Sequence, residues 1–156
     1  MGADPRVMAY FPALLSREQS VAFIAKIEER FESNGFSFWA LERKSDGAFV
    51  GFTGLNRPNF AAPFMPCVEV GWRLAFDHWG QGYATEAAQA SLSYAFDDLG
   101  VSEVVAFTAT GNERSRKVME RLGMAYDPTG DCDHPNVPDG HILKRHVLYR
   151  IQCHSH

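Results

Sequence analysis

Apolar positions in the first third of the chain predict one amphipathic helix. They recur every three or four residues from Val21 to Phe31, the spacing that places side chains on one helix face. Ser16, with Gln19 three residues later, forms a capping-box sequence of the kind that begins a helix. Glycine readily takes the positive φ that ends a helix. The sequence therefore predicts a helix that begins after Ser16 and ends at Gly35.

Two aromatic and β-branched runs follow the helix and predict antiparallel strands over 36–42 and 48–55. Asp46-Gly47, between the runs, supplies the positive φ of a tight hairpin. Residues 56–66 hold three prolines and show no period, so they predict a loop.

The second half of the chain alternates between strand and helix patterns. The predicted order is a strand over 67–76, a helix over 84–99, a strand over 103–109, a helix from 112 to 122, a loop over 126–144 and a closing strand over 145–151. Gly71, in the middle of the first of these strands, predicts a bulge or a close backbone approach. Strand and helix in alternation indicate an α/β fold.

Composition and charge narrow the class of protein. A chain of 156 residues with 46% hydrophobic residues predicts one globular domain. The net charge is −4 and no long basic run is present, which argues against nucleic-acid binding. No stretch reaches the roughly 20 apolar residues of a membrane span, and the first ten residues lack a signal-peptide pattern, so the cytoplasm is predicted.

The cysteines and late histidines predict neither disulfides nor a metal site. Cys67, Cys132 and Cys153 are odd in number and far apart, so they are predicted to be reduced thiols. The late cluster comprises Asp131, Cys132, Asp133, His134, His141, His146, His154 and His156. Its spacing matches no zinc signature, so no metal is expected.

Residues 78–86 carry the strongest chemical signal. Gly80 and Gly82 stand where a strand gives way to a helix, and free backbone N–H groups at such a turn form a concave site for an anion, most plausibly phosphate. The sequence lacks the Gly-Lys-Ser/Thr of a P-loop and the third glycine of a dinucleotide fingerprint. It fits a pyrophosphate that the backbone alone holds, without metal, as in recognition of coenzyme A.

Three motifs together resemble the GNAT N-acetyltransferase superfamily. They are Glu69-Val-Gly-Trp-Arg-Leu74, Trp79-Gly-Gln-Gly-Tyr-Ala-Thr-Glu86 and Asn112-Glu-Arg-Ser115-Arg-Lys-Val-Met-Glu-Arg-Leu-Gly-Met124. The resemblance is strongest to the branch of ribosomal-protein alanine acetyltransferases (RimJ/RimL-like), and it extends from about residue 4 to residue 150.

The resemblance implies a fold and a donor site. The implied fold is α/β (α+β), with a mixed, mostly antiparallel twisted sheet flanked by helices. Acetyl-CoA would lie where the strand at 68–76 splays from the strand at 103–109. The implied cofactor-binding residues are Trp72, Arg73, Leu74, Trp79, Gly80, Gln81, Gly82, Tyr83, Ala84, Thr85, Asn112 and Ser115.

Transfer of an acetyl group to an amine requires a base, and the leaving thiolate requires a proton. Glu69 is the first candidate for the base, Ser115 for the acid, and Asn112 for a contact with the pantetheine arm. Each also has a structural interpretation: Glu69 as a strand carboxylate paired with an arginine, and Asn112 and Ser115 as ordinary helix-start residues.

Other residues remain alternatives for catalysis and for the acceptor site. His134 or Asp133 are alternative bases, and Tyr126 is a remote alternative acid. The candidate walls of the acceptor pocket are Phe38, Trp39, Phe60, Phe64, His134 and His141. Acidic residues near the predicted mouth (Glu69, Asp131 and Asp133) favour a cationic acceptor.

The predicted function is acetyl transfer from acetyl-CoA to a primary amine by direct attack in a ternary complex. The amine belongs to a protein N-terminus or to a small molecule, and the sequence leaves both open. A non-catalytic acyl-CoA-binding or sensing module is the alternative, and a structural interaction domain is a third possibility.

Two features depart from the family pattern. The family's usual first strand has no counterpart before residue 4, which predicts an open sheet edge and a homodimer formed through it. Asp77 stands where many members carry Gln or Arg ahead of the glycines, so a polar helper is missing there.

Overall fold

The computed structural model describes residues 1–154. Its helices and strands are α1 (Arg17–Asn34), β1 (Phe38–Glu42), β2 (Phe49–Asn56), β3 (Glu69–Leu74), α2 (Tyr83–Ser93), β4 (Glu103–Ala109), α3 (Glu113–Arg121), β5 (Ala125–Tyr126), β6 (Cys132–Asp133) and β7 (Arg145–Gln152). Short 3-10 turns cover Phe76–His78 (η1) and Pro128–Gly130 (η3), and a π-helical turn, Tyr94–Asp98 (η2), continues α2. His156, assigned above to the late cluster, lies outside the described residues.

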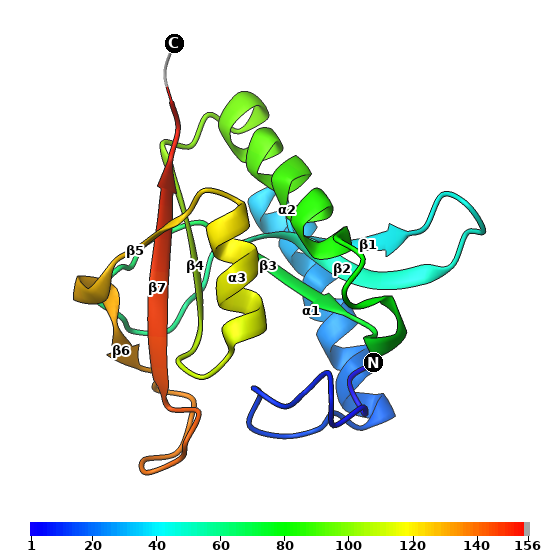
Figure 1. The fold of residues 1–156 in the computed structure, drawn as a ribbon, viewed down its shortest axis with the longest axis horizontal. Helices are drawn as coiled ribbons and strands as arrows, with labels where there is room; N and C mark the ends of the chain where they lie inside the picture. Colours follow the sequence, from blue (N-terminus) through cyan, green and yellow to red (C-terminus); the bar gives the residue numbers. More distant parts are fainter. Residues whose placement is uncertain (155–156) are drawn as a thin grey trace.

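The strands form one mixed, mostly antiparallel sheet in the order β1-β2-β3-β4-β7-β5, with β6 also paired to β7 (Figure 1). β3 and β4 pair in parallel, and their recorded register is the single pair Glu69 and Val105. The two strands diverge beyond that point. This arrangement confirms the predicted fold class and the predicted splayed strand pair.

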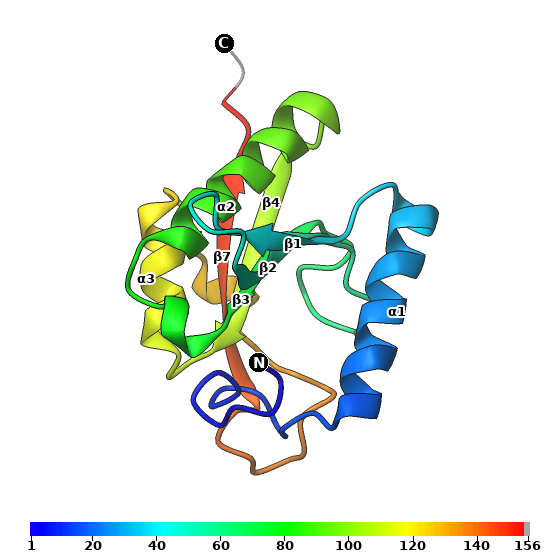
Figure 2. The ribbon, with the colours of Figure 1, turned by 90° about the vertical axis from the view of Figure 1, so that its right-hand side faces the viewer.

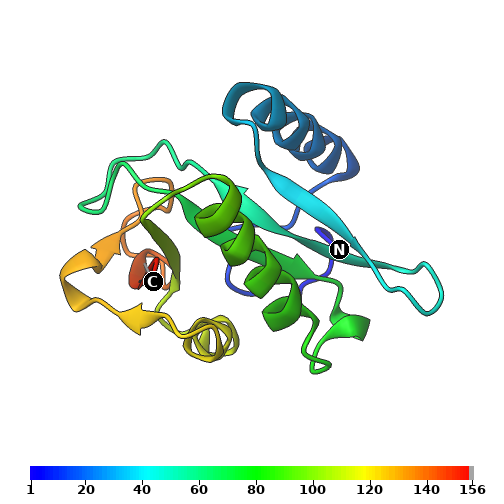
Figure 3. The same ribbon diagram turned by 90° about the horizontal axis from the view of Figure 1, so that it is seen from above.

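The helices lie on both faces of the sheet. α2 and α3 cover one face, and α1 lies on the other, as seen from the side in Figure 2 and from above in Figure 3. The main core lies under α2 and α3, where Val104 and Ala106 of β4 meet Leu92 and Met119. A smaller cluster on the opposite face joins Val105 and Leu148 to the loop before β3. The α1 face is therefore the more open of the two.

α1 begins as predicted, but only part of its predicted apolar stripe contacts the sheet. The Ser16 hydroxyl accepts from the Gln19 N–H at 3.1 Å, and the Gln19 side chain accepts from the Ser16 N–H at 2.8 Å. Val21 is 59% exposed, whereas the Phe23 ring lies 5.7 Å from Phe52 and Phe31 packs on the sheet eight residues later. Because Phe23 and Phe31 share a stripe, the helix is rotated so that the larger aromatic side chains contact the sheet.

Two further predictions need correction. The pairing of β3 with β2 runs without a register shift, so the bulge predicted at Gly71 is wrong. The alternative of a close approach is nearer the truth, because an added Cβ there would lie 3.1 Å from the Phe38 ring. The segment 126–144, predicted as a loop, contributes the end of β5 and all of β6, which extend the sheet beyond β7.

One sheet edge is formed by β1, whose recorded partner is β2. In residues 1–154 no helix combines the length and the apolarity that a membrane span requires. The same part of the chain holds no group of three or more His, Cys, Asp or Glu residues arranged for a metal ion.

Candidate active site

A cavity of about 1200 Å³ lies where β3 separates from β4. Its lining comes from segments far apart in the sequence: residues 6–12, α1, β3, the start of α2, α3 and residues 134–146. The cavity therefore reaches both faces of the sheet, the one that α2 and α3 cover and the one on which α1 lies.

The backbone of β3 offers free hydrogen-bonding groups on the β4 side. The Ala75 N–H donates to the Val50 carbonyl, and the Val105 N–H donates to the Val68 carbonyl. Peptide groups alternate in direction along a strand, so odd-numbered residues of β3 pair with β2 and even-numbered residues face β4. Trp72 thus directs its N–H and C=O into the gap. The backbone of Arg73 points to β2 instead, and the carbonyl of Leu74 accepts from the Trp79 indole at 2.9 Å.

The turn before α2 forms a cradle open to an anion. Gly80 and Gly82 have φ of 73° and 82°, and a Cβ added to either would meet nothing within 4 Å. Gly82 caps α2 without a side-chain acceptor, and Glu86 is the first α2 residue whose N–H bonds back, to the Gly82 carbonyl at 3.0 Å. The N–H groups of residues 83–85 are therefore available. Donors of this kind at a helix start fit the pyrophosphate of acetyl-CoA.

The side chains around the cradle divide into two groups. Trp79 lines the cavity, and the Arg114 guanidinium lies 4.5 Å from its ring centroid. Gln81 donates to the Asp77 carbonyl at 3.3 Å and, like the Tyr83 side chain, does not belong to the cavity lining.

α3 adds positive charge that the sequence interpretation missed. Arg114, Lys117 and Arg121 all line the cavity. Their spacing of three and four residues along α3 was the signal available in the sequence, because such positions share one helix face. Cations there suit the phosphates of coenzyme A.

Asn112 and Ser115 lie at the start of α3 and bond to each other. The Asn112 amide donates to the Thr108 hydroxyl at 2.9 Å and to the Ser115 hydroxyl at 3.2 Å, and its oxygen accepts from the Ser115 N–H at 3.3 Å. Asn112 is therefore a helix cap whose amide is already engaged. The Ser115 oxygen acts as an acceptor, which leaves its hydroxyl hydrogen available for donation.

Glu69 lies at the point where β3 and β4 separate. It lines the cavity and accepts a hydrogen bond from the Asn56 amide at 2.9 Å. Burial raises the pKa of its carboxyl to about 7, although the Asn56 hydrogen bond and the charge of Arg30 oppose that rise. A carboxyl with such a pKa is divided between acid and base near neutral pH.

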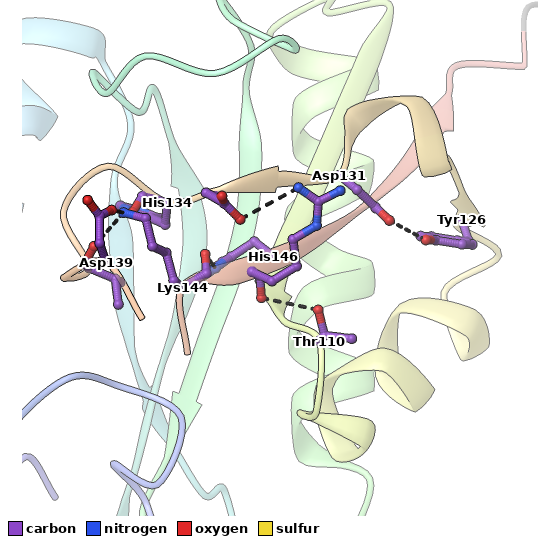
Figure 4. Close-up of polar contacts among 10 residues, drawn as sticks. Thr110, Tyr126, Asp131, His134, Asp139, Lys144 and His146 are labelled. Carbon is purple, nitrogen blue, oxygen red and sulfur yellow. Dashed lines mark hydrogen bonds and ion pairs between the residues drawn. The ribbon is translucent and has the colours of Figure 1, made fainter. Parts of the chain in front are cut away.

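His134 and His146 form the opposite wall of the cavity (Figure 4). Their ring centroids are 5.0 Å apart, and the Phe60 ring lies 4.1 Å from His134. Burial lowers the pKa of His134 to about 4 and also lowers the pKa of His146. Both imidazoles are therefore neutral at pH 7.

Several predicted members of the site lie elsewhere. Asp131 accepts from the Tyr126 hydroxyl, as Figure 4 shows, and Asp133 of β6 pairs with Arg145 at 3.6 Å. None of these residues lines the cavity, and Trp39, Phe60, Phe64 and His141 also lie outside the lining, whereas Phe38 is part of it. The acidic mouth predicted from Asp131 and Asp133 is therefore absent from the described cavity.

The sequence model of the Acetyltransferase (GNAT) domain family matches residues 1–125. The chain belongs to this family. It is an N-acetyltransferase, and GNAT acetyltransferases use acetyl-CoA. The open cradle, the free β3 backbone and the basic α3 face fit that donor.

Individual relatives agree with the family assignment. The chain is similar to the Bacillus subtilis protein YkkB, with 33% identity over 126 residues that cover 81% of this chain and 72% of YkkB. It is 35% identical over 124 residues to the Aspergillus fumigatus FsC-acetyl coenzyme A-N(2)-transacetylase, in a match that covers 75% of this chain and half of that enzyme. An acetyltransferase structure from Agrobacterium tumefaciens has a TM-score of 0.74 and 25% identity, covering 97% of this chain and 80% of that one.

Proposed function

We propose that the protein transfers an acetyl group from acetyl-CoA to a primary amine by direct attack of the amine in a ternary complex. The observation that carries the proposal is Glu69, a cavity-lining carboxyl with a pKa of about 7 at the point where β3 leaves β4. Acetyl-CoA supplies the activated acetyl group as a thioester. The protein must then supply a base and a proton donor.

Glu69 is assigned as the base. An amine enters the site mostly as an ammonium ion, and the ionised Glu69 carboxylate accepts its proton before attack. Asn56 supports this role, because its amide holds one Glu69 oxygen at 2.9 Å and leaves the other free. His134 is the alternative base that also lines the cavity, and its pKa of about 4 separates it from Glu69.

Ser115 is assigned as the acid and Asn112 as the residue that positions it. The Asn112 amide fixes the Ser115 oxygen from one side, so the hydroxyl hydrogen is directed away from Asn112. That hydrogen is available for donation to the leaving sulfur. The donor itself is assigned to the backbone of Trp72 and to the cradle formed by residues 80–85.

The same proposal covers the acceptor, the domain organisation, the cellular location and the oligomeric state. The motif resemblance to the RimJ/RimL-like branch favours a protein N-terminal amine, with a small amine as the alternative acceptor. We also propose that residues 1–156 form a single GNAT domain, that the enzyme acts in the cytoplasm, and that the exposed β1 edge supports a homodimer.

The experiment is the pH profile of amine-dependent thiol release. We expect kcat/KM to rise with pH through a pKa of about 7, because Glu69 must be ionised. Glu69→Gln should remove this limb and lower kcat by about 100-fold or more, with the Kd for acetyl-CoA unchanged. The control uses two acceptors whose amines differ in pKa. The pH at which kcat/KM rises should be the same for both acceptors if the rise reports Glu69.

The outcomes separate the alternatives. A limb near pH 4 that disappears in His134→Gln would transfer the role of base to His134. Binding of acetyl-CoA without thiol release from any amine would contradict the proposed activity and favour the non-catalytic module.

A further inference from the structure

The charges that line the cavity oppose the overall charge of the protein. The chain as a whole carries −4. The cavity is lined by six cationic side chains, Arg6, Arg30, Arg73, Arg114, Lys117 and Arg121, and by two carboxylates, Glu69 and Glu113. The three cations on α3 are the ones assigned to the donor phosphates. Arg30 and Arg73 remain on the α1 face, where no phosphate of the donor is assigned.

Arg73 is held in an aromatic box. Its guanidinium carbon lies 4.2 Å from the ring centroid of Phe11, 5.3 Å from that of Phe52 and 5.5 Å from that of Phe23. These rings come from the N-terminal segment, β2 and α1. Three separate parts of the chain therefore fix the position of one cation at the wall of the cavity.

Among residues 1–154, the side-chain donors of Arg73 have no protein partner. Its Nε is enclosed and unbonded, and within residues 1–154 its guanidinium makes no hydrogen bond or ion pair. An enclosed donor without a partner is costly, and aromatic rings satisfy the charge but not the N–H groups. Burial also lowers the pKa of Arg73 to about 10. A planar anion would satisfy both the charge and the donors.

Glu69 and Arg73 stand on the same face of β3, four residues apart. At about 3.3 Å per residue, their Cα atoms are about 13 Å apart. Gly71 lies between them, and the Phe38 ring covers it, because an added Cβ there would lie 3.1 Å from that ring. Phe38 also lines the cavity, so an acceptor that reaches both residues passes over its ring. An extended chain of three residues spans about 10 Å, and one of four residues about 13 Å, so a peptide of about this length is comparable with the separation of the two residues.

We propose that Arg73 binds a carboxylate of the acceptor, at the far end of the molecule whose amine lies at Glu69. This inference rests on the proposed function, because it takes Glu69 as the place of reaction. The acceptor is then a peptide-like amine with an acidic group about three residues from its amine. That group is a C-terminal carboxylate or an acidic side chain, and both present the same planar anion to the guanidinium.

The test compares two pairs of acceptors, and the members of each pair differ only in the carboxylate. The pairs are tri-alanine with tri-alanine C-terminal amide, and Ala-Ala-Glu-Ala amide with Ala-Ala-Gln-Ala amide. We expect the wild-type kcat/KM for tri-alanine to exceed that for its amide by roughly 10-fold to 100-fold, the range for a hydrogen bond to a charged group. A similar preference for the glutamate peptide over the glutamine peptide would identify the side-chain source.

Variants locate the effect at Arg73. Arg73→Met, which retains an apolar side chain for the aromatic box, should reduce the acid-to-amide ratio to about one. Arg73→Lys should keep part of the ratio, because it keeps the charge but loses the planar fork. The control is Arg57→Met, since Arg57 is exposed and lies outside the cavity lining, and it should keep the full ratio. Circular dichroism and acetyl-CoA affinity check that Arg73→Met is folded.

Binding of tri-alanine and of its amide to the CoA-bound protein, measured by calorimetry, separates this inference from the proposed function. If acetyl transfer fails but the inference holds, tri-alanine still binds more tightly than its amide without turnover. Equal binding of the two, a ratio that survives in Arg73→Met, or no binding of any acidic probe would overturn the inference.

Discussion

The two faces of the sheet are built differently. On the face assigned to the donor, the main feature is one short stretch, 76–86, whose glycines and helix start expose backbone N–H groups to the cavity. The acceptor face depends on side chains from the N-terminal segment, α1, β3 and residues 134–146. Backbone recognition needs few particular side chains, so a short local motif is enough to indicate it. Side-chain recognition arises only when distant segments meet, so it leaves no local pattern in the sequence.

The largest expected effect comes from breaking the donor face. Gly82→Val should weaken acetyl-CoA binding by about 100-fold or more, because a β-branched residue resists the φ of 82° and its side chain enters the cradle. Calorimetry measures the loss. Gly100→Val is the matched control: Gly100 has a φ of 67° and equally open surroundings but lies outside the cavity lining, so it carries the backbone strain without the intrusion.

If Gly100→Val weakened acetyl-CoA binding as much as Gly82→Val, the loss would be one of folding and the assignment of the cradle would be wrong.

A second experiment measures how much the buried Glu69 carboxyl lowers the free energy of unfolding. Its folded pKa of about 7 lies above the usual 4.5, so the folded state holds the proton more tightly. Below about pH 4.5 Glu69 is protonated in both the folded and the unfolded state, so its effect on the free energy of unfolding does not change with pH. As the pH rises from about 4.5 to about 7, the free energy of unfolding falls by up to about 3 kcal/mol. Glu69→Gln should therefore raise the free energy of unfolding at pH 8 and leave it nearly unchanged at pH 4.5.

Urea denaturation at the two pH values measures the difference. The same gain at both values would mean that Glu69 does not titrate in the folded protein as described.

The smallest expected effect tests whether α3 contributes to acetyl-CoA binding. Arg114→Gln should weaken acetyl-CoA binding about 3-fold to 10-fold and reduce its dependence on salt, because it removes one cation that lines the cavity beside Trp79. Lys26→Gln removes the same charge from an exposed position on α1 and should change neither quantity. If both variants changed acetyl-CoA affinity and its salt dependence equally, Arg114 would not contact acetyl-CoA directly.

Sequence patterns predicted the local features well. β4 occupies the predicted residues 103–109, the capping box at Ser16 is present, and Asn112 caps α3 as expected. Each of these depends on neighbours in the chain. The same is true of the glycine turn, which the structure leaves open at the start of α2.

The errors concern contacts between distant segments. The periodicity of α1 contains two apolar stripes, and only packing decides that Phe23 rather than Val21 faces the sheet. Asp131 and Asp133 are predicted near the mouth, but Asp133 belongs to β6, which pairs with β7, and neither residue lines the cavity. The aromatic box of Arg73 likewise joins residues from three elements, which no local pattern reveals.

The single register pair that joins β3 to β4 has a consequence for the cavity. The sheet consists of two groups of strands, β1 to β3 and β4 with β7, β5 and β6, and one recorded register pair joins them. Glu69 and Arg73 belong to the first group, and His146 belongs to the second. The cavity therefore follows the boundary between the two groups, and a molecule that fills it contacts side chains of both.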